Sequence, residues 1–369
     1  MPKTVYVGMS GGVDSSVSAL LLKEQGYHVI GVYMKNWSKD LPGMKCPWAE
    51  DLADAKRVAT KLDIDFEVWD FEDAYKKKVV DYMLAEFKKG NTPNPDIMCN
   101  QEIKFKLFYE EAMKRGADFI ATGHYARTMR IKSSFEGHKT WASAPERPEK
   151  EAFYSHLLRA ADNNKDQTYF LYRISDEALA HTLFPIGDML KPDVKKLAEK
   201  HGLHNAYKKE SMGVCFVGEV GMKDFLKEYI DIKPGEIREL ESDKVLGYHE
   251  GAIFYTIGQR HGLYVGGGLP YYIVKKDLAK NILYVSQNLN DDNLWTTELE
   301  LKDVFMRNKE TATAGPRTVL VRIRHRAPLL PATFDGTKVI FEKPIKRIAP
   351  GQSVVFYDGE VCLGGGIVV

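Results

Sequence analysis

The sequence predicts an α/β protein with a doubly wound, mostly parallel sheet, followed by a small central domain and a C-terminal β-barrel. In the first half, apolar runs alternate with helical stretches, which is typical of βαβ units. After about residue 217 the sequence changes to short apolar runs between glycine-rich turns, which favours a small barrel. A loop of small residues, GMSGGVDSS, follows the first predicted strand.

Four strands and four helices are predicted in the first half. The strands are TVYVGM (4–9), HVIGVYM (28–34), DFEVWDF (65–71) and DFIATGHY (118–125). The helices cover residues 15–25, 49–62, 72–88 and 101–115, and a further helical region covers 166–202. Gly26 and Gly116 stand where helix C-caps belong. Ligands of such sheets bind at the carboxyl ends of the strands, so GMSGGVDSS is a candidate site.

The second half predicts a barrel built from short strands. These are NILYVSQ, ELELKDVFM, RTVLVRIRH, PATFDG, KVIFE, QSVVFYDG and EVCLGGGIVV, with Asp-Gly turns among them. Residues 132–151 are polar and contain two prolines, so we expect an exposed loop or hairpin there. The predicted domains are residues 1–216 (catalytic), 217–280 (small central) and 281–369 (barrel).

The composition is that of a globular protein. Of 369 residues, 44% are hydrophobic and 28% are charged. The apolar runs are too short to span a bilayer, and the N-terminus enters a predicted strand without a secretory leader. We therefore expect a cytoplasmic location and no membrane association.

Positive charge is concentrated in one part of the C-terminal region. The net charge of +1 provides no overall attraction for a polyanion. Between residues 317 and 347, however, eight Lys or Arg residues stand against two acidic residues. This excess fits either a surface for a phosphate backbone or an ordinary solvated face, and a charge run alone more often belongs to the latter.

The four cysteines form neither a disulfide framework nor a zinc site. Cys46, Cys99, Cys215 and Cys362 include no C-x-x-C pair. Cys215 lies among small and apolar residues in SMGVCFVGE, as in a mobile loop, although a buried thiol in the core is the alternative.

Cys99 has neighbours that suit a reactive thiol. Two prolines in NTPNPDIMC predict a rigid loop, and a predicted helix begins at residue 101. A helix N-terminus favours the thiolate, although a lone cysteine at such a place is more often inert. Asp96 is close enough in a turn to handle protons.

The loop SGGVDS is suited to phosphate but is no Walker A loop, because it contains no lysine. Ser10, Ser15 and the N–H groups at a helix start can bind phosphate, and Asp14 can help to order Mg²⁺. The loop resembles the PP-loop of the ATP pyrophosphatases, which cleave ATP between its α and β phosphates. The resemblance implies ATP and Mg²⁺ as cofactors, with no certain metal site formed by the protein itself.

Several motifs in order resemble the bacterial tRNA-specific 2-thiouridylases along nearly the whole chain. They are MSGGVDSSV, TPNPDIMCNQEIKF, ATGHYAR, KDQTYFL, MGVCFVGE, YTIGQRHGL and PGQSVVFYDGEVCLGGG. The resemblance implies 2-thiolation of the wobble uridine (U34) of tRNA. ATP adenylates uracil O2, sulfur passes from a persulfide on Cys215 with Cys99 as partner thiol, and AMP and pyrophosphate are released.

The resemblance also implies site residues by position. The catalytic residues are Cys99, Cys215 and Asp96. The ATP-binding residues are Gly8, Met9, Ser10, Gly11, Gly12, Val13, Asp14, Ser15, Met34 and Gly123. The tRNA-binding residues are Asn94, Pro95, Asp96, His124, Lys165, Asp166, Gln167, Arg324, His325 and Gln352. His325 stands where some relatives have a tyrosine, which would stack more strongly on a base.

The implied partners are the tRNAs for Lys, Glu and Gln, and a sulfur donor that is either a cysteine desulfurase or a sulfur-relay protein. Cys99 either releases hydrosulfide from Cys215 or attacks the persulfide while its terminal sulfur attacks the base. Both routes end in a Cys99–Cys215 disulfide that a reductant reopens. A small-molecule PP-loop ligase, such as an amide synthetase, is the alternative enzyme class, and a catalytically silent RNA-binding protein is the third hypothesis. The ligase leaves the paired cysteines and the basic barrel unexplained.

Overall fold

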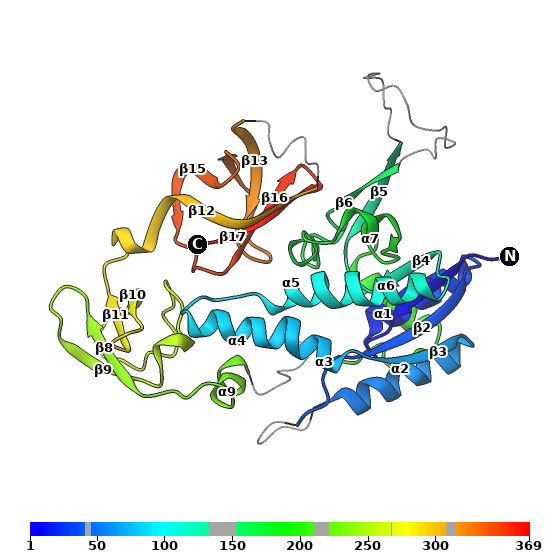
Figure 1. The fold of residues 1–369 in the computed structure, drawn as a ribbon, viewed down its shortest axis with the longest axis horizontal. Helices are drawn as coiled ribbons and strands as arrows, with labels where there is room; N and C mark the ends of the chain where they lie inside the picture. Colours follow the sequence, from blue (N-terminus) through cyan, green and yellow to red (C-terminus); the bar gives the residue numbers. More distant parts are fainter. Residues whose placement is uncertain (41–45, 133–152, 210–220, 267, 308–314) are drawn as a thin grey trace, which may run out of the picture.

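The computed structural model describes residues 1–40, 46–132, 153–209, 221–266, 268–307 and 315–369. Three sheets organise them (Figure 1). Helix α4 (Asp81–Lys88) and the continuous helical stretch from α5 (Pro95–Cys99) to α6 (Phe108–Lys114) run from the first sheet toward the middle sheet. The barrel lies beside them in this view. No helix among the described residues is both long and apolar enough to cross a membrane.

The first sheet is parallel and has the strand order β3-β2-β1-β4-β7. Its strands are β1 (Thr4–Gly8), β2 (His28–Lys35), β3 (Asp65–Asp70), β4 (Phe119–Thr122) and β7 (Thr182–Leu183). The doubly wound sheet predicted from the four apolar runs is confirmed. The chain continues from β1 to one side through β2 and later returns to the other side with β4, so β1 and β4 flank the switch point.

Helices pack on both faces of this sheet, and others extend from it toward the rest of the molecule. They are α1 (Val13–Glu24), α2 (Trp48–Leu62), α3 (Glu72–Tyr75), η1 (Lys76–Val80), α4 (Asp81–Lys88), α5 (Pro95–Cys99), η2 (Asn100–Leu107), α6 (Phe108–Lys114), η3 (Thr168–Phe170), α7 (Asp176–Ala180) and α8 (Lys191–Lys200). Val5 and Val7 of β1 pack with Val194 of α8 on one face. Tyr6 packs with Phe108 on the other face. The single helical region predicted for 166–202 is wrong, because two short helices and the edge strand β7 precede α8.

The middle sheet has the order β10-β11-β8-β9. Its strands are β8 (Gly235–Glu239), β9 (Val245–His249), β10 (Tyr272–Asp277) and β11 (Ile282–Ser286), accompanied by α9 (Met222–Lys227) and η4 (Ala252–Phe254). The run NILYVSQ, which we assigned to the barrel, forms β11 and pairs with β8 and β10. The predicted boundary at residue 280 therefore falls inside this sheet, and the boundary at 216 lies outside the described residues.

The C-terminal strands close into the predicted barrel. After η5 (Asp292–Leu294) come β12 (Trp295–Met306), β13 (Arg317–Arg322), β14 (Leu330–Phe334), β15 (Lys338–Lys346), β16 (Ser353–Asp358) and β17 (Val361–Val368). Antiparallel pairing of β12 with β17 completes the ring of six strands. β17 also pairs with β6 (Phe153–Leu158), which pairs with β5 (Arg127–Lys132), so a pair of strands from the N-terminal half extends the barrel sheet. Residues 133–152 of the predicted loop between β5 and β6 lie outside the described residues.

A junction loop, residues 90–94, is held by all three parts of the molecule. The backbone N–H of Thr92 donates to the carbonyl oxygen of Pro350 in the barrel at 2.7 Å. The ammonium group of Lys276 in the middle sheet donates to the carbonyl oxygen of Gly90 at 2.9 Å. Burial lowers the pKa of Lys276 to about 8. The loop leads directly into α5, which carries the predicted base-binding and catalytic residues.

Candidate active site

The predicted phosphate loop lies at the switch point of the parallel sheet. Gly8 ends β1, and Gly123 follows the neighbouring strand β4. A Cβ atom on Gly123 would lie 2.5 Å from the backbone nitrogen of Ser15, so a side chain has no room there. The end of β4 thus packs directly on the first turn of α1, and the two predicted ATP-binding segments lie together.

The first turn of α1 offers backbone N–H groups. The N-cap residue Gly12 has no side chain, and within the described part of the chain no side-chain cap hydrogen bond is formed at this end of the helix. The hydroxyl of Ser15 spans the loop, because it accepts from the backbone N–H of Ser10 at 3.2 Å and donates to the carbonyl oxygen of Gly12 at 3.1 Å. Uncapped donors at the start of a 12-residue helix suit an anion, so the loop fits the phosphates of ATP.

The other predicted ATP contacts divide into two groups. Met34 of β2 approaches Gly8 closely, since its Cε atom would lie 2.8 Å from a Cβ atom there. Met9 and Val13 are only 1% and 3% exposed, and both side chains belong to the core beneath the loop. Any contact of Met9 or Val13 with the nucleotide therefore runs through the backbone.

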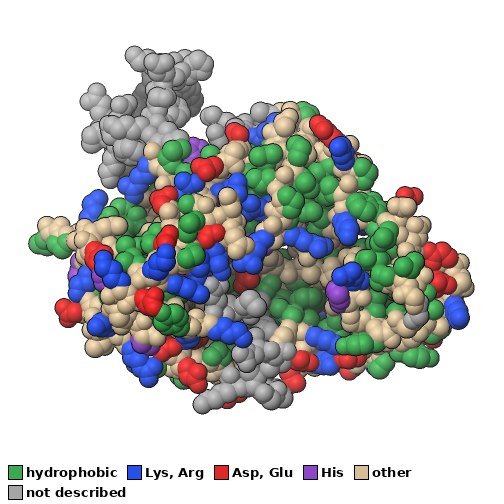
Figure 2. Space-filling view, turned by 180° about the vertical axis from the view of Figure 1, so that it is seen from behind, with side chains coloured by type: hydrophobic (Ala, Val, Ile, Leu, Met, Phe, Trp, Pro, Cys, Tyr) green, Lys and Arg blue, Asp and Glu red, His purple; other side chains and the backbone are tan. Residues whose placement is uncertain are grey.

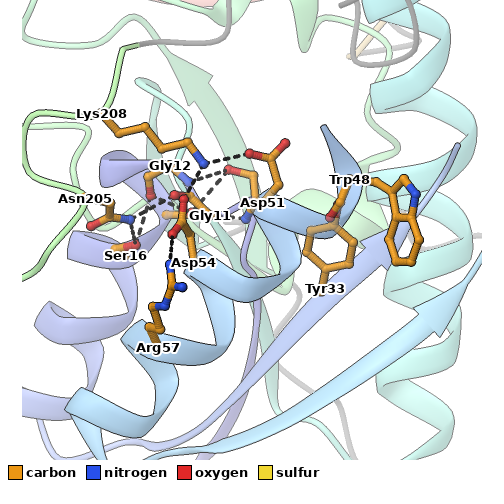
Figure 3. A network of polar contacts seen from close by, with 12 residues as sticks. Gly11, Gly12, Ser16, Tyr33, Trp48, Asp51, Asp54, Arg57, Asn205 and Lys208 are labelled. Carbon is orange, nitrogen blue, oxygen red and sulfur yellow. Dashed lines mark hydrogen bonds and ion pairs between the residues drawn. The ribbon is translucent and has the colours of Figure 1, made fainter. Parts of the chain in front are cut away.

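A buried asparagine clamps the back of the loop (Figure 3). The Nδ2 atom of Asn205 donates to the carbonyl oxygen of Gly11 and to the hydroxyl of Ser16, both at 2.9 Å. Gly11 has a φ of +77°, and a Cβ atom there would collide with the carbonyl oxygen of Asp51 in α2. Glycine is therefore required at this position, and Asn205 is a positioning residue that we did not find in the sequence.

Charged residues extend this clamp to α2. The ammonium group of Lys208 lies 2.7 Å from Asp51 and 2.6 Å from Asp54 (Figure 3). Burial opposes the charge of Asp54, but hydrogen bonds from Lys208 and His204 lower its pKa overall. The segment around Asn205 is thereby fixed against both the phosphate loop and α2.

Replacing Asn205 with alanine is expected to weaken ATP binding roughly tenfold, because two hydrogen bonds that hold the loop are lost. Binding of tRNA should not change. The measurements are ATP titration by calorimetry and tRNA binding by filter retention. Arg57→Ala is the matched control, because Arg57 belongs to the same network through Asp54 but its side chain is 66% exposed. An unaltered ATP affinity in the Asn205 variant would contradict the clamp.

A buried lysine holds Asp14. The ammonium group of Lys191, the first residue of α8, lies 2.7 Å from both carboxylate oxygens of Asp14. The hydroxyl of Tyr125 donates to the same carboxylate at 3.0 Å. The side chain of Lys191 is 8% exposed. The phosphate loop itself has no lysine, so the contact supplies a positive charge that the sequence did not reveal.

The residues around Asp14 also fit a magnesium ion that arrives with ATP. No group of three or more His, Cys, Asp or Glu in the described ranges could hold a metal ion. Mg²⁺ is commonly bound by one or two carboxylates together with substrate phosphates. Asp14 is 29% exposed and lies in the first turn beside the phosphate donors, so it is the carboxylate that would hold the ion, in competition with Lys191.

The predicted helix start at residue 101 is wrong. α5 begins at Pro95 and continues through η2 into α6, so Cys99 lies one turn inside a helical stretch. Asn94 is the N-cap, and its Oδ1 atom accepts from the backbone N–H groups of Asp96 at 3.1 Å and Ile97 at 3.3 Å. The argument from the helix terminus therefore does not apply to Cys99, because the dipole effect is confined to the first turn. Asn-Pro is a helix-start signal that the rigid-loop interpretation overlooked.

One cation, Lys104, acts on the predicted acid–base residue Asp96 and on the predicted tRNA-binding residue His124. Burial raises the pKa of Asp96, and the positive charge of Lys104 partly opposes this rise. Burial also lowers the pKa of His124 well below its usual value, with a further contribution from Lys104. His124 is therefore neutral near pH 7, and its Nδ1 atom lies 2.8 Å from the hydroxyl of Thr122. Lys104 belongs to η2, a π-helical segment of a kind often found at functional sites, and we did not single it out from the sequence.

The cysteines differ in their surroundings. Cys99 is 3% exposed and packs in the cluster between α4 and η2. Burial raises the pKa of Cys46, and it raises the pKa of Cys362 to about 11, so neither thiol suits a nucleophile. Cys215 lies outside the described residues, and its role stays a prediction.

A cavity of about 310 Å³ lies between the junction loop, η3 and the barrel. It is lined by Thr92, Pro93, Asn94, Tyr169, Phe170, Arg324, His325, Gln352 and Ser353. The rings of Phe170 and His325 lie 4.6 Å apart, and burial lowers the pKa of His325 to about 4. Nδ1 of His325 and Oε1 of Gln352 are buried without a hydrogen-bond partner in the described part of the chain. Aromatic faces beside unused polar atoms suit a nucleobase.

The structure separates the residues of the predicted Lys-Asp-Gln contact. The side chain of Asp166 is fully buried and pairs with Arg322 of the barrel at 2.6 Å. The carboxylate of Asp166 thus docks the barrel, and the predicted contact of this residue with tRNA stays a prediction. Oε1 of Gln167 accepts from the backbone N–H of Tyr125 at 2.8 Å. Lys165 remains partly exposed, and its charge acts on His325.

The eight basic residues between 317 and 347 do not form one surface. Arg322 is buried, Arg326 donates to the backbone oxygen of Asn164 at 2.9 Å, and Arg347 donates to backbone oxygens near η5. Part of the basic excess therefore holds the barrel in place. Figure 2 nevertheless shows a hollow in one face of the molecule with Lys and Arg side chains along its rim, which suits a phosphate backbone.

Family models match three successive parts of the chain. Residues 3–219 match the tRNA methyl transferase HUP domain, residues 223–287 the tRNA methyl transferase PRC-barrel domain, and residues 296–368 the aminomethyltransferase beta-barrel domain. The three matches follow the order of the parallel sheet, the middle sheet and the barrel.

Curated relatives match the chain from end to end. The tRNA-specific 2-thiouridylase MnmA of Listeria monocytogenes serotype 4a is 46% identical over 372 residues, which cover 99% of this chain and 94% of the relative. The protein of the same name from Streptococcus sanguinis is 45% identical over 373 residues with the same coverage. A solved 4-thiouridine synthetase–RNA complex with bound ATP has a TM-score of 0.37 and 14% identity, covers 61% of this chain and 50% of that chain, and carries no argument.

The descriptions of the first two family models name methyl transferases, whereas the full-length relatives are thiouridylases. Identity along the whole chain is the stronger criterion, because it includes the phosphate loop, α5 and the barrel at once. The chain therefore belongs to the family of tRNA-specific 2-thiouridylases.

Proposed function

We propose that this enzyme thiolates position 2 of the wobble uridine (U34) of tRNA, with ATP and Mg²⁺ as cofactors. One structural observation supports this proposal in addition to the family membership. The strand end that packs on the phosphate loop, Gly123, is followed directly by His124. The ring of His124 lies 5.7 Å from that of Phe105 in η2, the segment that continues the helix of Asp96. This contact supports neighbouring sites for the nucleotide and the base.

The first step activates the base. Uracil O2 attacks the α-phosphate of ATP, a bond from O2 to phosphorus forms, and the bond to pyrophosphate breaks. The uncapped N–H groups of α1 stabilise the charge that develops on the pyrophosphate. Mg²⁺ held by Asp14 would supply Lewis-acid stabilisation to the same phosphates.

The base has to leave its stack, because C2 and O2 are otherwise out of reach of the enzyme. Asp96 is the acid–base residue beside the flipped uridine, and its raised pKa brings it closer to the pH at which it works. Asn94 and Pro95 position Asp96 by starting α5. The cavity beside Phe170 and His325 takes another base of the anticodon loop.

The second step exchanges oxygen for sulfur. A persulfide on Cys215 provides the sulfur, AMP leaves with the former O2, and Cys99 and Cys215 end as a disulfide that an external reductant reopens. Release of hydrosulfide and direct attack by the persulfide consume the same reactants and give the same products. The proposed substrates are the tRNAs for Lys, Glu and Gln, and the sulfur donor is a cysteine desulfurase or a sulfur-relay protein.

A single assay tests this function. The enzyme is incubated with ATP, Mg²⁺, sulfide and unmodified tRNA, and the nucleosides are analysed by mass spectrometry. We expect 2-thiouridine, and we expect none with a tRNA that carries cytidine at the wobble position. ATP–pyrophosphate exchange with a small carboxylic acid and without RNA would contradict the proposal and favour a small-molecule ligase.

A further inference from the structure

The Lys191–Asp14 ion pair lies beside the phosphate donors. Asp14 is the second residue of α1, in the turn whose N–H groups lack a side-chain cap. The ammonium group that lies 2.7 Å from its carboxylate oxygens is therefore next to the anion site. Lys191 comes from α8, 177 residues away in the sequence, and is 6% exposed as a whole residue.

The charges at this place raise a question about ATP binding. A carboxylate beside the phosphate donors repels a polyphosphate, and Lys191 cancels that repulsion while it is paired with Asp14. A buried ammonium group needs a negative partner at all times, because an unpaired buried charge is costly. A polyphosphate can serve as that partner once Mg²⁺ shares the carboxylate of Asp14.

We propose that Lys191 binds the pyrophosphate part of ATP and so supplies the phosphate-binding lysine that the loop lacks. This inference rests on the proposed ATP-dependent function. Asp14 holds the ammonium group in place, and the group would turn to the β and γ phosphates when the carboxylate is shared with a Mg²⁺ ion. In Walker A loops a lysine within the loop makes this contact. A lysine can move between partners because its four-carbon stem is flexible.

A purely structural ion pair makes a different prediction. If Lys191 only stabilised the packing of α8 on α1, its loss would affect all ligands of the loop alike. If Lys191 binds the pyrophosphate part, its loss affects ATP and inorganic pyrophosphate but spares AMP, which has only the α-phosphate. The ratio of the affinities for pyrophosphate and AMP therefore separates the two roles.

The test uses the full-length enzyme without tRNA and measures dissociation constants for ATP, inorganic pyrophosphate and AMP by calorimetry in the presence of Mg²⁺. For Lys191→Met we expect a roughly tenfold or larger rise for ATP and pyrophosphate, and a change for AMP within about twofold. Lys191→Arg keeps the charge and should recover part of the affinity for pyrophosphate. The arginine variant also provides a test of the proposal if the methionine variant fails to fold. Lys196→Met is the matched control on the same helix, because its side chain is 76% exposed.

Equal changes for the three ligands, or no change at all, would overturn the role of Lys191. These outcomes leave the proposed function intact, because the wild-type enzyme would still bind ATP and thiolate tRNA. A wild-type enzyme that binds neither ATP nor pyrophosphate would overturn both proposals.

Discussion

Asp96→Asn is expected to abolish 2-thiolation and, at neutral pH, to stabilise the fold. Asparagine keeps the shape of the side chain but cannot exchange a proton with the base, and loss of a general acid–base residue lowers rates by about 100- to 10,000-fold. The gain in stability follows from burial, which raises the pKa of Asp96 above its ordinary value of 3.8. At neutral pH the folded protein therefore bears the cost of a buried carboxylate.

The raised pKa of Asp96 makes the stability of the fold depend on pH in a defined direction. A raised pKa in the folded state favours the protonated form, so the contribution of Asp96 to stability is most favourable below its ordinary pKa of 3.8. It is lost as the pH rises through the raised value. The stability difference between Asp96→Asn and wild type should thus be largest near pH 7.5 and shrink toward pH 4.

Thermal unfolding at several pH values and thiolation assays measure both effects of Asp96→Asn. Asp73→Asn is the control, because Asp73 is an exposed carboxylate in the first turn of α3. It should leave activity and melting temperature unchanged. A variant of Asp96 that retained thiolation would remove this residue from the mechanism.

Cys99→Ser is expected to stop catalytic turnover, because both routes of sulfur transfer need Cys99 as the partner of Cys215 in the final disulfide. Serine is nearly isosteric, so the main structural cost is a buried hydroxyl of about 1 to 3 kcal/mol. ATP and tRNA should still bind. Mass spectrometry of the tRNA measures the loss of 2-thiouridine, and added sulfide separates the two routes. Rescue by sulfide favours hydrosulfide release, whereas no rescue favours direct attack.

Cys362→Ser is the matched control for this experiment. Cys362 is also fully buried, and it lies in β17 of the barrel, where no step of the proposed reaction takes place. Its replacement should have a similar structural cost and leave the activity per folded molecule unchanged. Wild-type turnover in the Cys99 variant, or equal losses in both variants, would contradict the role of Cys99.

The parallel sheet and the phosphate loop were predictable because their signals are local. Strands buried on both faces read as continuous apolar runs, and SGGVDS combines a tight turn with a helix start. The N-cap at Asn94 also has a local signal, because Asn before Pro favours a helix start, but the same prolines are equally typical of a rigid loop. Cys99 therefore lies inside the helical stretch and not before its N-terminus.

The residues that were missed act over long sequence distances. Lys191 and Asn205 reach the phosphate loop from segments with no recognisable motif. Asp166 looks like a surface residue in the sequence, but its buried partner Arg322 lies 156 residues away. Strand pairing is equally nonlocal, which is why NILYVSQ was assigned to the barrel although it pairs in the middle sheet.

The junction loop at residues 90–94 has a consequence for incomplete chains. It begins at the end of α4, is fastened at Thr92 to Pro350 and at Gly90 to Lys276, and continues into the helix with Asp96 and Cys99. A truncated product without its last twenty residues would lose the anchor at Pro350, and the start of α5 would lack that contact. The position of the segment that leads into α5 therefore depends on the last strands of the barrel, far along the chain from it.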